Sequence, residues 1–581
     1  MPEPAEGWRP CLLVTAFRRA SPIPDLPLRR LGGRTLLERC VAGASISASA
    51  IGAPLICLCD SQEIALACER ATPADAPHVE IIASPSLGTA KLTQLLAGLG
   101  RRFSHAIILD PACPLLHSED APRAWQALMT AGADGLFSVR QAPARPWSSA
   151  GSLAAHLSAA RADAGLVQSP AISIIRLSAL DAHDPAILAW PLGGRAREIR
   201  GYEDFWICER LLSRRHVVFV VAGYPAIGLG HVYRALMLAH EINNHRVSFV
   251  CTAHSELAVE SIAGRDYPVI RQGKEALAET VLRQRPDMVV NDILDTGENY
   301  MRALGKLPLV NFEDRGEGAA MASLTVNALY EDESPRPGLL QGPSWFCLRD
   351  EFLNARRNSL RERARVILIT FGGTDKANCT LRCLNIIEPI ARAYGMEIRI
   401  VAGPGYAHKG ALEAHVQALE NPLVSFTWST NVMSRMMEGC DLCISAAGRT
   451  VYELCHMRVP GMVLAQHERE ASHRFARPAH GFYFAGVASR VSDVRIRNIF
   501  LALLRQERRA LYWHRQNGLD FTGNKARLVA LMQNMLEDGH AQQKSQDSRH
   551  SPGPAGLNAP ANEIPAQSQG AGDHRLGGRK A

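Results

Sequence analysis

Short apolar runs alternate with helix-like segments along most of this 581-residue chain, and this alternation limits the possible folds more than any other feature. In the first part the strand-like runs are Leu12–Val14, Leu55–Leu58, Val79–Ile82 and Ala106–Leu109, and the helix-like segments include Leu36–Ala44 and Gln62–Ala71. Strands that alternate with helices form mostly parallel sheets with helices on both faces. The sequence therefore predicts a doubly wound α/β domain from Cys11 to about Leu212.

Two further series of the same kind follow, and each opens on an apolar run and then a glycine-rich turn. The runs are Val217–Val221, Val247–Val250, Met288–Val290 and Leu309–Val310, and then Val366–Thr370, Ile398–Val401, Leu442–Ser445 and Met462–Leu464. A polar, helix-like segment, Asn354–Ala364, separates the two series. This repeated order predicts two nucleotide-binding-like lobes that face a cleft.

The predicted domain boundaries follow from these patterns. From about Asp538 the chain is rich in Gln, Ser, Gly and Pro and loses its apolar periodicity, which predicts a disordered tail. We expect a flexible N-terminus at 1–10, an α/β domain at 11–214, lobes at 215–364 and 365–537, and the disordered tail at 538–581.

Composition excludes several classes of protein. The chain is 47% apolar and 21% charged, which is typical of a soluble globular protein of several domains. Its formal charge of +7 is spread thinly, so we predict no nucleic-acid partner. The 14 cysteines are scattered and form no Cys/His cluster, so no metal site is expected. With no signal peptide and no run of about 20 apolar residues to span a membrane, a cytoplasmic protein is predicted.

The turn Ile227-Gly-Leu-Gly-His-Val-Tyr-Arg234 follows the run Val217–Val221 and leads into helix-forming residues. Gly228 and Gly230 allow backbone N–H groups to approach a ligand closely, and a helix N-terminus favours an anion there. His231 stands at this opening, where an imidazole exchanges protons near neutral pH. A phosphate-facing turn with a histidine at its mouth indicates nucleotide-sugar chemistry.

Two later turns repeat the order of strand, glycine and helix. The first is Phe371-Gly-Gly-Thr-Asp375, which contains Gly372, Gly373 and Thr374, and the second is Ser445-Ala-Ala-Gly-Arg-Thr-Val-Tyr-Glu453. In the second, Gly448 permits close approach of a phosphate, and Thr450 is predicted to cap the helix and donate to a phosphate oxygen. Glu453, one turn into the helix, has the geometry to accept both hydroxyls of a ribose. Each turn alone is equally explained as a plain helix cap, but three in one half of the chain favour a ligand site.

Four motifs in this order resemble those of a known family: Gly228-x-Gly-His-Val-x-Arg234, Gly342-Pro-x-x-x-x-Leu-Arg-x-Glu-Phe352, Phe371–Asp375 and Ser445–Glu453. Over about 217–535 the chain is similar to UDP-2,4-diacetamido-2,4,6-trideoxy-β-L-altropyranose hydrolases of the pseudaminic acid pathway and to their spore-coat polysaccharide relatives. These proteins share the GT-B fold of lipid II-forming N-acetylglucosaminyltransferases. The resemblance implies a two-lobed GT-B-like region.

The same resemblance implies a reaction. His231 matches the catalytic histidine, and water attacks the anomeric carbon to release UDP and a free diacetamido-trideoxy-hexose without a metal. Asp292, at the C-terminal end of a predicted strand, matches an acidic residue with a supporting role, although a helix-capping role explains it nearly as well. The family carries an Asn-Gln pair where this chain has Gln466-His-Glu-Arg-Glu470, followed by His473. Arg234, His467 and Glu468 are therefore candidates for contacts with a different sugar.

The first domain resembles acylneuraminate cytidylyltransferases, which implies a GT-A-like nucleotidyltransferase fold. The resemblance rests on Val14–Arg34, Asp60–Ile64, Asp110–Leu115, Gly132–Val139 and Tyr202–Phe205. The catalytic letters differ: the Arg-Gly-Gly-Ser-Lys triphosphate loop reads Phe17-Arg-Arg-Ala-Ser21, a glutamine becomes Asp110, and the magnesium-binding Asp-x-Asp reads Glu198-Ile-Arg200. The family's second lysine and its asparagine are replaced by Leu26 and Pro27. In the altered Asp-x-Asp, Arg200 cannot ligate a cation. Arg18, Arg19, Arg29, Arg30 and Arg34 remain as an anion-attracting or simply solvated face.

The leading hypothesis is a fusion of two enzymes of nonulosonic (pseudaminic or sialic-like) acid biosynthesis, in which only the hydrolase is active. The hydrolase needs no cofactor, and Mg and CTP are implied only if the first domain is active. Its partners are then a UDP-sugar substrate and other pathway enzymes. Three alternatives stay open: a GT-B glycosyltransferase of surface polysaccharide synthesis, an active CMP-nonulosonate cytidylyltransferase, and an assembly protein that binds UDP without turnover.

Overall fold

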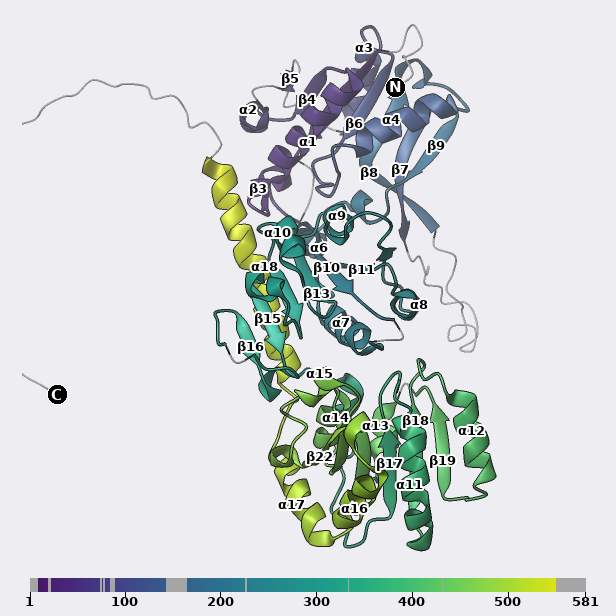
Figure 1. Ribbon diagram of the computed structural model, residues 1–581. Helices are drawn as coiled ribbons and strands as arrows, with labels where there is room; N and C mark the ends of the chain where they lie inside the picture. The colour runs from purple at the N-terminus through teal and green to yellow at the C-terminus, as the bar shows by residue number, and fades with distance from the viewer. Residues whose placement is uncertain are drawn as a thin grey trace, which may run out of the picture. The chain divides into compact units, whose positions relative to one another are not determined.

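The computed structural model describes residues 9–18, 22–73, 76, 79–83, 89–142, 165–224, 227–332, 334–430 and 432–549. Two compact units are present, the first comprising Met1–Arg215 with Asn244–Arg246 and the second His216–Asn243 with Val247–Ala581. Each unit contains parallel strands and helices, so the prediction of an α/β chain is confirmed (Figure 1). Of the predicted N-terminal and C-terminal tails, residues 1–8 and 550–581 lie outside the described residues.

The first unit is built on one large sheet. Its elements are β1 (Pro10–Ala16), β2 (Arg30–Leu31), β3 (Arg34–Thr35), α1 (Leu36–Ile51), β4 (Leu55–Cys59), α2 (Gln62–Ala71), β5 (Val79–Ala83), α3 (Thr89–Leu99), β6 (His105–Leu109), α4 (Asp120–Ala131), β7 (Gly135–Ala142), β8 (Gly165–Arg176), β9 (Ile187–Pro191) and α6 (Tyr202–Leu212). The described strands pair in the order β5-β4-β1-β6-β8-β7-β9. Only β8 runs antiparallel to its described neighbours, β6 and β7.

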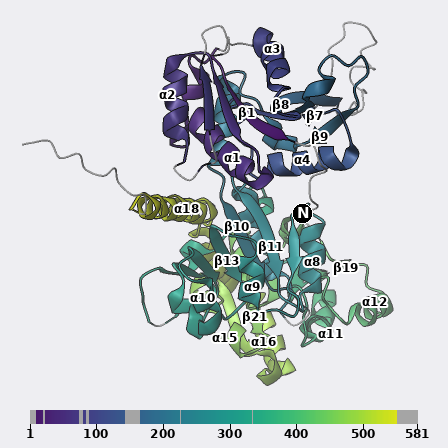
Figure 2. The same ribbon diagram turned by 90° about the horizontal axis from the view of Figure 1, so that it is seen from above.

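Alternate residues of β1 are buried in two different hydrophobic cores, one on each face of the sheet. Leu12 and Val14 pack with residues of α1, α2 and α4. Cys11 and Leu13 pack on the opposite face with Leu96 and Leu99 of the helix α3. A strand that is buried on both faces has a continuous apolar sequence, and this pattern predicted the strand here. Figure 2 shows the first unit from above, with α3 on one side of the sheet and α1 and α4 on the other.

The second unit contains two parallel sheets, and we call the part built on each sheet a lobe. The first lobe comprises β10 (His216–Val221), α7 (Gly230–Glu241), β11 (Arg246–Cys251), α8 (Glu256–Ala263), β12 (Val269–Arg271), α9 (Leu277–Leu282), β13 (Met288–Asp292), α10 (Glu298–Leu304), β14 (Leu309–Phe312), β15 (Leu324–Asn327) and β16 (Leu339–Gln341). Its strand order is β12-β11-β10-β13-β14-β15-β16. This places β10 beside β13, with Val221 opposite Asp292.

The second lobe follows the same logic. Its elements are β17 (Val366–Thr370), α11 (Cys379–Ala393), β18 (Glu397–Ala402), α12 (Lys409–Ala418), β19 (Val424–Trp428), α13 (Met433–Met437), β20 (Leu442–Ala446), α14 (Thr450–His456), β21 (Gly461–Ala465), α15 (Glu468–Ala471), β22 (Phe482–Val487), α16 (Asp493–Leu503) and α17 (Gln506–Asn517). The order of strands is β19-β18-β17-β20-β21-β22. In both lobes the first strand therefore lies inside the sheet, and the turn after it opens at the edge where strands end.

The segment 354–364 is not the helix that its polar, periodic sequence predicts. It runs as turns and extended chain, and its side chains bind backbone groups of the second lobe. Asn358 donates to the carbonyls of Met437 and Met457 at 2.9 and 3.0 Å, and Arg361 donates to the carbonyl of Gly439 at 2.8 Å. These tertiary hydrogen bonds replace the bonds that a helix would have made within itself.

The last helix returns to the first lobe. In α18 (Asn524–Arg549), Leu528, Val529, Met532 and Leu536 pack in the same core as β10 and α7 (Figure 1). The helix continues to Arg549, so the prediction that regular structure is lost from residue 538 is wrong up to that point. The residues beyond 538 include the helix formers Ala541, Gln542 and Gln543, which extend a helix already nucleated by packing.

We expect Gly461→Ala to destabilise the second lobe because a methyl group there would overlap the carbonyl oxygen of Cys443 on the neighbouring strand. The expected loss is about 2 kcal/mol or more in the free energy of unfolding. Gly410→Ala in α12 is the matched control, since a methyl group at Gly410 meets nothing within 4 Å. The control should be neutral or stabilising by a few tenths of a kcal/mol. Urea denaturation of both variants measures the difference, and equal midpoints would contradict the prediction.

Candidate functional site

The glycine turn of the first lobe connects β10 to α7, as the sequence predicts. Gly228 has a φ of +75°, a conformation that favours glycine. The N-cap position of α7 is Leu229, which offers no side-chain acceptor to the first amide groups of the helix. These N–H groups and the positive end of the helix dipole are thus available to an anionic ligand.

His231, in the first turn of α7, is hydrogen-bonded to Asp292 at the end of β13. The distance from His231 Nδ1 to Asp292 Oδ1 is 2.5 Å. The two residues come together because β10 and β13 are neighbours in the sheet, which brings the turn after one strand to the end of the other. Since the carboxylate accepts from Nδ1–H, the neutral ring carries its lone pair on Nε2. Among the described residues Nε2 has no hydrogen-bond partner, so its lone pair can accept a proton from a ligand or a water molecule.

A buried arginine completes this cluster. Arg234, one turn after His231, donates to Asp292 through Nε at 2.7 Å and through a terminal nitrogen at 2.6 Å. Its other terminal nitrogen donates to Glu313 at 3.1 Å, and its guanidinium lies 4.7 Å from the ring centre of Phe312. Burial alone would raise the pKa of Asp292, but Arg234 and His231 beside it lower it to about 2. Asp292 therefore stays ionised, and Arg234 is a support of this carboxylate, with all three donor nitrogens engaged.

The glycine turn of the second lobe lies against the turn of the first. Gly372 has a φ of +80°, and a methyl group at Gly373 would lie 3.8 Å from the backbone nitrogen of Leu229. A methyl group at Gly228 would lie 3.7 Å from the methyl carbon of Thr374. The structure thus brings together the two predicted phosphate-binding turns, which are far apart in the sequence.

The turn after β20 differs from its prediction in one respect. Thr450 is the first residue of α14, and Arg449 occupies the cap position without a side-chain cap bond, so the predicted capping role of Thr450 is wrong. Arg449 already has helical backbone angles, so Thr450 stands inside the first turn of the helix rather than at its cap position. Glu453 is buried, and Arg349 donates to one of its oxygens at 2.8 Å. Its second oxygen has no hydrogen-bond partner among the described residues.

Arg449 is the residue that sequence reasoning missed. Its side-chain Cδ would lie 3.3 Å from a methyl group at Gly230, so it reaches the glycine turn of the opposite lobe. The guanidinium lies 4.9 Å from the ring centre of Phe346 and has no carboxylate partner in the described part of the chain. Burial and the nearby charge of Arg234 lower its pKa to about 10. The motif Gly448-Arg-Thr was visible in the sequence, but only the fold shows that this cation faces His231's turn.

The segment Gln466–Glu470 follows β21 and forms the start of α15. His467 is exposed and caps this helix, accepting from the backbone nitrogen of Glu470 at 3.4 Å. Glu468 forms an exposed ion pair with Arg490 at 2.6 Å. Glu470 lies beside Gly448, with an oxygen 3.9 Å from where a methyl group at Gly448 would be. Burial raises the pKa of Glu470 to about 7.

In the first unit several of the substituted positions form ion pairs within the unit. Arg200 donates to Glu198 at 2.9 Å, where the resembling family places two magnesium-binding carboxylates. Arg18 is held by ion pairs with Asp25 and Glu63. The other predicted loop residues, 19–21, and with them Arg19, lie outside the described residues.

Three more of the predicted anion-attracting arginines and Asp110 are described. Arg29 and Arg30 donate to the carbonyls of Pro24 and Gly33 at 2.7 and 3.0 Å. Arg34 is exposed in β3. Asp110 accepts from the backbone nitrogen of Ala112 at 2.9 Å. Arg29 and Arg30 each use one of their five N–H donors on a backbone carbonyl in these contacts.

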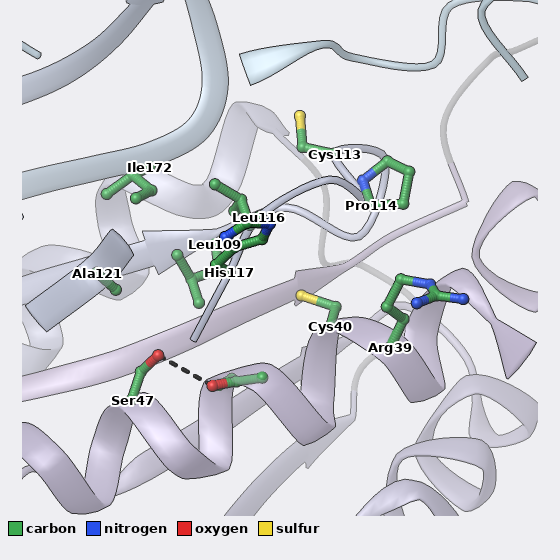
Figure 3. A pocket seen from close by; sticks show the side chains of 12 residues that line it. Arg39, Cys40, Ser47, Leu109, Cys113, Pro114, Leu116, His117, Ala121 and Ile172 are labelled. Atoms are coloured by element: carbon green, nitrogen blue, oxygen red, sulfur yellow. Dashed lines mark hydrogen bonds between the residues drawn. The ribbon is translucent and has the colours of Figure 1, made fainter. Parts of the chain in front are cut away.

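A small cavity of about 30 Å³ lies in the first unit between α1 and the chain after β6 (Figure 3). Its lining is Arg39, Cys40, Gly43, Ala44, Ser47, Leu109, Cys113, Pro114, Leu116, His117, Ala121 and Ile172. This volume accommodates one or two water molecules.

The described residues have two further properties that concern ligands and membranes. Among these residues no group of three or more His, Cys, Asp or Glu side chains is arranged to hold a metal ion. No helix in the described part of the chain is long and apolar enough to cross a membrane.

Known proteins similar to this chain include two curated sequences. An uncharacterized protein of Methanocaldococcus jannaschii is 25% identical over 272 residues, which are 43% of this chain and 56% of that protein. The spore coat polysaccharide biosynthesis protein SpsG of Bacillus subtilis is 24% identical over 271 residues, 44% of this chain and 78% of that protein. The chain thus spans little more than half the length of the archaeal protein.

The crystal structure of MurG from Acinetobacter baumannii is similar with a TM-score of 0.40 and 17% identity, covering 55% of this chain and 99% of MurG. No protein-family model matches the chain. The predicted resemblance to spore-coat polysaccharide proteins is confirmed by the Bacillus match, whereas the cytidylyltransferase resemblance stays a prediction.

We expect Asp292→Asn to lower the free energy of unfolding of the second unit by about 3 kcal/mol at pH 7, because it leaves the buried Arg234 with Glu313 as its remaining acidic partner. The pKa of Asp292, about 2, lies below the value of about 3.9 for an unfolded aspartate. Its stabilising contribution is therefore complete above pH 4 and is lost as the pH falls through 2.

Urea denaturation at pH 7, 5 and 3 checks this dependence. The difference between wild type and Asp292→Asn should shrink at pH 3. Asp493→Asn, which removes an exposed ion pair with Arg382, is the control and should change little. A difference that does not depend on pH would contradict the assignment of the stabilisation to the ionised carboxylate.

Proposed function

We propose that the second unit is a nucleotide-sugar enzyme of polysaccharide or surface-glycan biosynthesis, and that it hydrolyses a UDP-sugar. The observation that carries this proposal is the hydrogen bond from His231 to the buried, ionised Asp292 at the mouth of a glycine turn. The similarity to a spore coat polysaccharide biosynthesis protein supports the broader class. The four motifs that resemble diacetamido-sugar hydrolases support the reaction and the substrate, a UDP-diacetamido-trideoxy-hexose.

In the proposed reaction, His231 Nε2 takes a proton from water while the water oxygen attacks the anomeric carbon of the sugar. The bond between that carbon and the phosphate oxygen breaks, and UDP leaves with the electron pair. The proton on the ring is stabilised by Asp292, which Arg234 keeps ionised. The products are UDP and the free sugar.

In this proposal the protein itself supplies the positive charge that stabilises the departing diphosphate. Arg449 lacks a carboxylate partner among the described residues and lies against Gly230, at the positive end of α7. A guanidinium and backbone N–H groups together stabilise the charge that develops on a leaving phosphate. We therefore propose that the hydrolase reaction needs no metal, and that Glu453 with its open oxygen receives the ribose.

We expect His231→Ala to lower kcat for release of free sugar about 100-fold or more, because general-base catalysis contributes 10²–10⁴-fold. The assay measures UDP and free sugar from a panel of UDP-diacetamido-trideoxy-hexoses. His240→Ala is the control on the same helix, where the ring bonds to the carbonyl of Leu236 and packs against Tyr267. The control should retain activity.

Three outcomes would change the proposal. If His231→Ala releases sugar at the wild-type rate, His231 is not the base. If the wild type transfers sugar to an added acceptor and releases none to water, the second unit is a glycosyltransferase. If UDP binds without turnover of any sugar, the second unit is a binding module.

We expect Arg449→Ala to weaken UDP binding about tenfold to 100-fold, since a hydrogen bond to a charged group is worth about 1.5–3 kcal/mol. Isothermal titration calorimetry with UDP measures the dissociation constant directly. Arg458→Ala in the same lobe is the control, because Arg458 rests on the ring of Trp513. Unchanged affinity in Arg449→Ala would remove this residue from the diphosphate site.

A further inference from the structure

Arg469 joins the two lobes of the second unit beside the His231 cluster. From α15 its guanidinium reaches Asp295 of the first lobe with two bonds, at 2.6 and 3.0 Å. The same side chain donates to the backbone carbonyl of Glu313 at 2.7 Å and lies 5.0 Å from the ring centre of Tyr330. A two-pronged contact of this kind fixes orientation as well as distance.

Both acceptors lie in turns with unusual backbone. Leu294, between Asp292 and Asp295, has a φ of +72°, and Glu313 has a φ of +52°. Non-glycine residues in this region cost of order 1–3 kcal/mol and persist only where the surrounding structure holds them. Arg469 bonds to the neighbour of one strained residue and to the carbonyl of the other.

The two turns carry the supports of the catalytic histidine. The carboxylate of Glu313 accepts from Arg234, Arg234 donates twice to Asp292, and Asp292 accepts from His231. Backbone amides of Ala328 and Leu329 hold the carboxylate of Glu313 at 3.2 and 3.1 Å. A continuous series of hydrogen bonds and one short backbone turn therefore connects Arg469 in the second lobe to His231 in the first.

We propose that Arg469 is a positioning residue, which holds from the second lobe the two turns that place Asp292 and Glu313 around His231. This inference rests on the function proposed above. Arg469 contacts the supports of His231, so its loss acts on the rate of the chemical step and leaves UDP binding largely unchanged. It belongs to the segment Gln466–Glu470, whose composition departs from the resembling family.

The test compares Arg469→Lys and Arg469→Ala with Arg490→Ala as the control. Arg490 pairs with Glu468 on the exposed side of the same short helix. We expect both Arg469 variants to lower kcat about tenfold to 100-fold, because small misplacement of catalytic groups costs this much. Lysine keeps the charge but loses the two-pronged contact, so it should not restore the rate. The affinity of the Arg469 variants for UDP should stay near that of the wild type. The activity of the control, Arg490→Ala, should also stay near wild type.

A double-mutant cycle with Asp295→Ala separates the pair from its surroundings. If the two residues act together, Arg469→Ala with Asp295→Ala should be little slower than either single variant. Additive losses would show that Arg469 does not act through Asp295. A loss confined to KM, with kcat intact, would make Arg469 a substrate contact and would overturn the proposal.

A second readout does not depend on turnover. The Nδ1–H resonance of His231, followed by NMR in histidine-labelled protein with UDP bound, reports the hydrogen bond to Asp292. It should move in Arg469→Lys and not in Arg490→Ala. An unmoved resonance overturns the positioning role even in an active enzyme. A resonance that moves in a protein with no hydrolase activity supports the positioning role while the proposed function fails.

Discussion

The site of the second unit depends on one buried ion pair, between Arg234 and Asp292. Asp292 is fully buried, and a lone carboxylate in that place would be protonated or would disfavour folding. Two hydrogen bonds from Arg234 keep it charged, and a charged carboxylate in turn orients His231. Arg234 itself is buried and needs a second acceptor, which Glu313 supplies. The same few side chains thus serve the stability of the fold and the proposed chemistry.

The sheet order explains why these groups meet. Parallel strands end at a common edge, so the turn after β10, the end of β13 and the end of β14 open side by side. His231 and Arg234 come from the helix after the first of these strands, Asp292 ends the second, and Glu313 follows the third. The second lobe repeats the arrangement and contributes Arg449 and Arg469 from the turns after its own strands. The first lobe therefore supplies the cluster of His231 and its buried ion pairs, and the second lobe supplies two further arginines beside it.

Much of the fold could be predicted from local sequence. Every apolar run that the sequence predicts to be a strand is a strand, and most of these runs are aliphatic and buried on both faces, which leaves few other choices. Two predictions differ from the structure: the helix expected at Asn354–Ala364 and the disorder expected from residue 538. In the first case tertiary hydrogen bonds from Asn358 and Arg361 compete with the helix, and in the second a packed helix extends into polar sequence. Periodicity describes neither effect.

The sequence by itself determined the α/β class, the order of strands and helices, the three glycine turns and the prominence of His231. It did so because backbone conformation and burial follow local residue patterns. The tertiary structure alone decided which turns face each other, that Arg234 supports Asp292, and that Arg449 and Arg469 reach across to the first lobe. These contacts join residues far apart in the sequence. Charge pairing across such distances is set by packing, which no local pattern encodes.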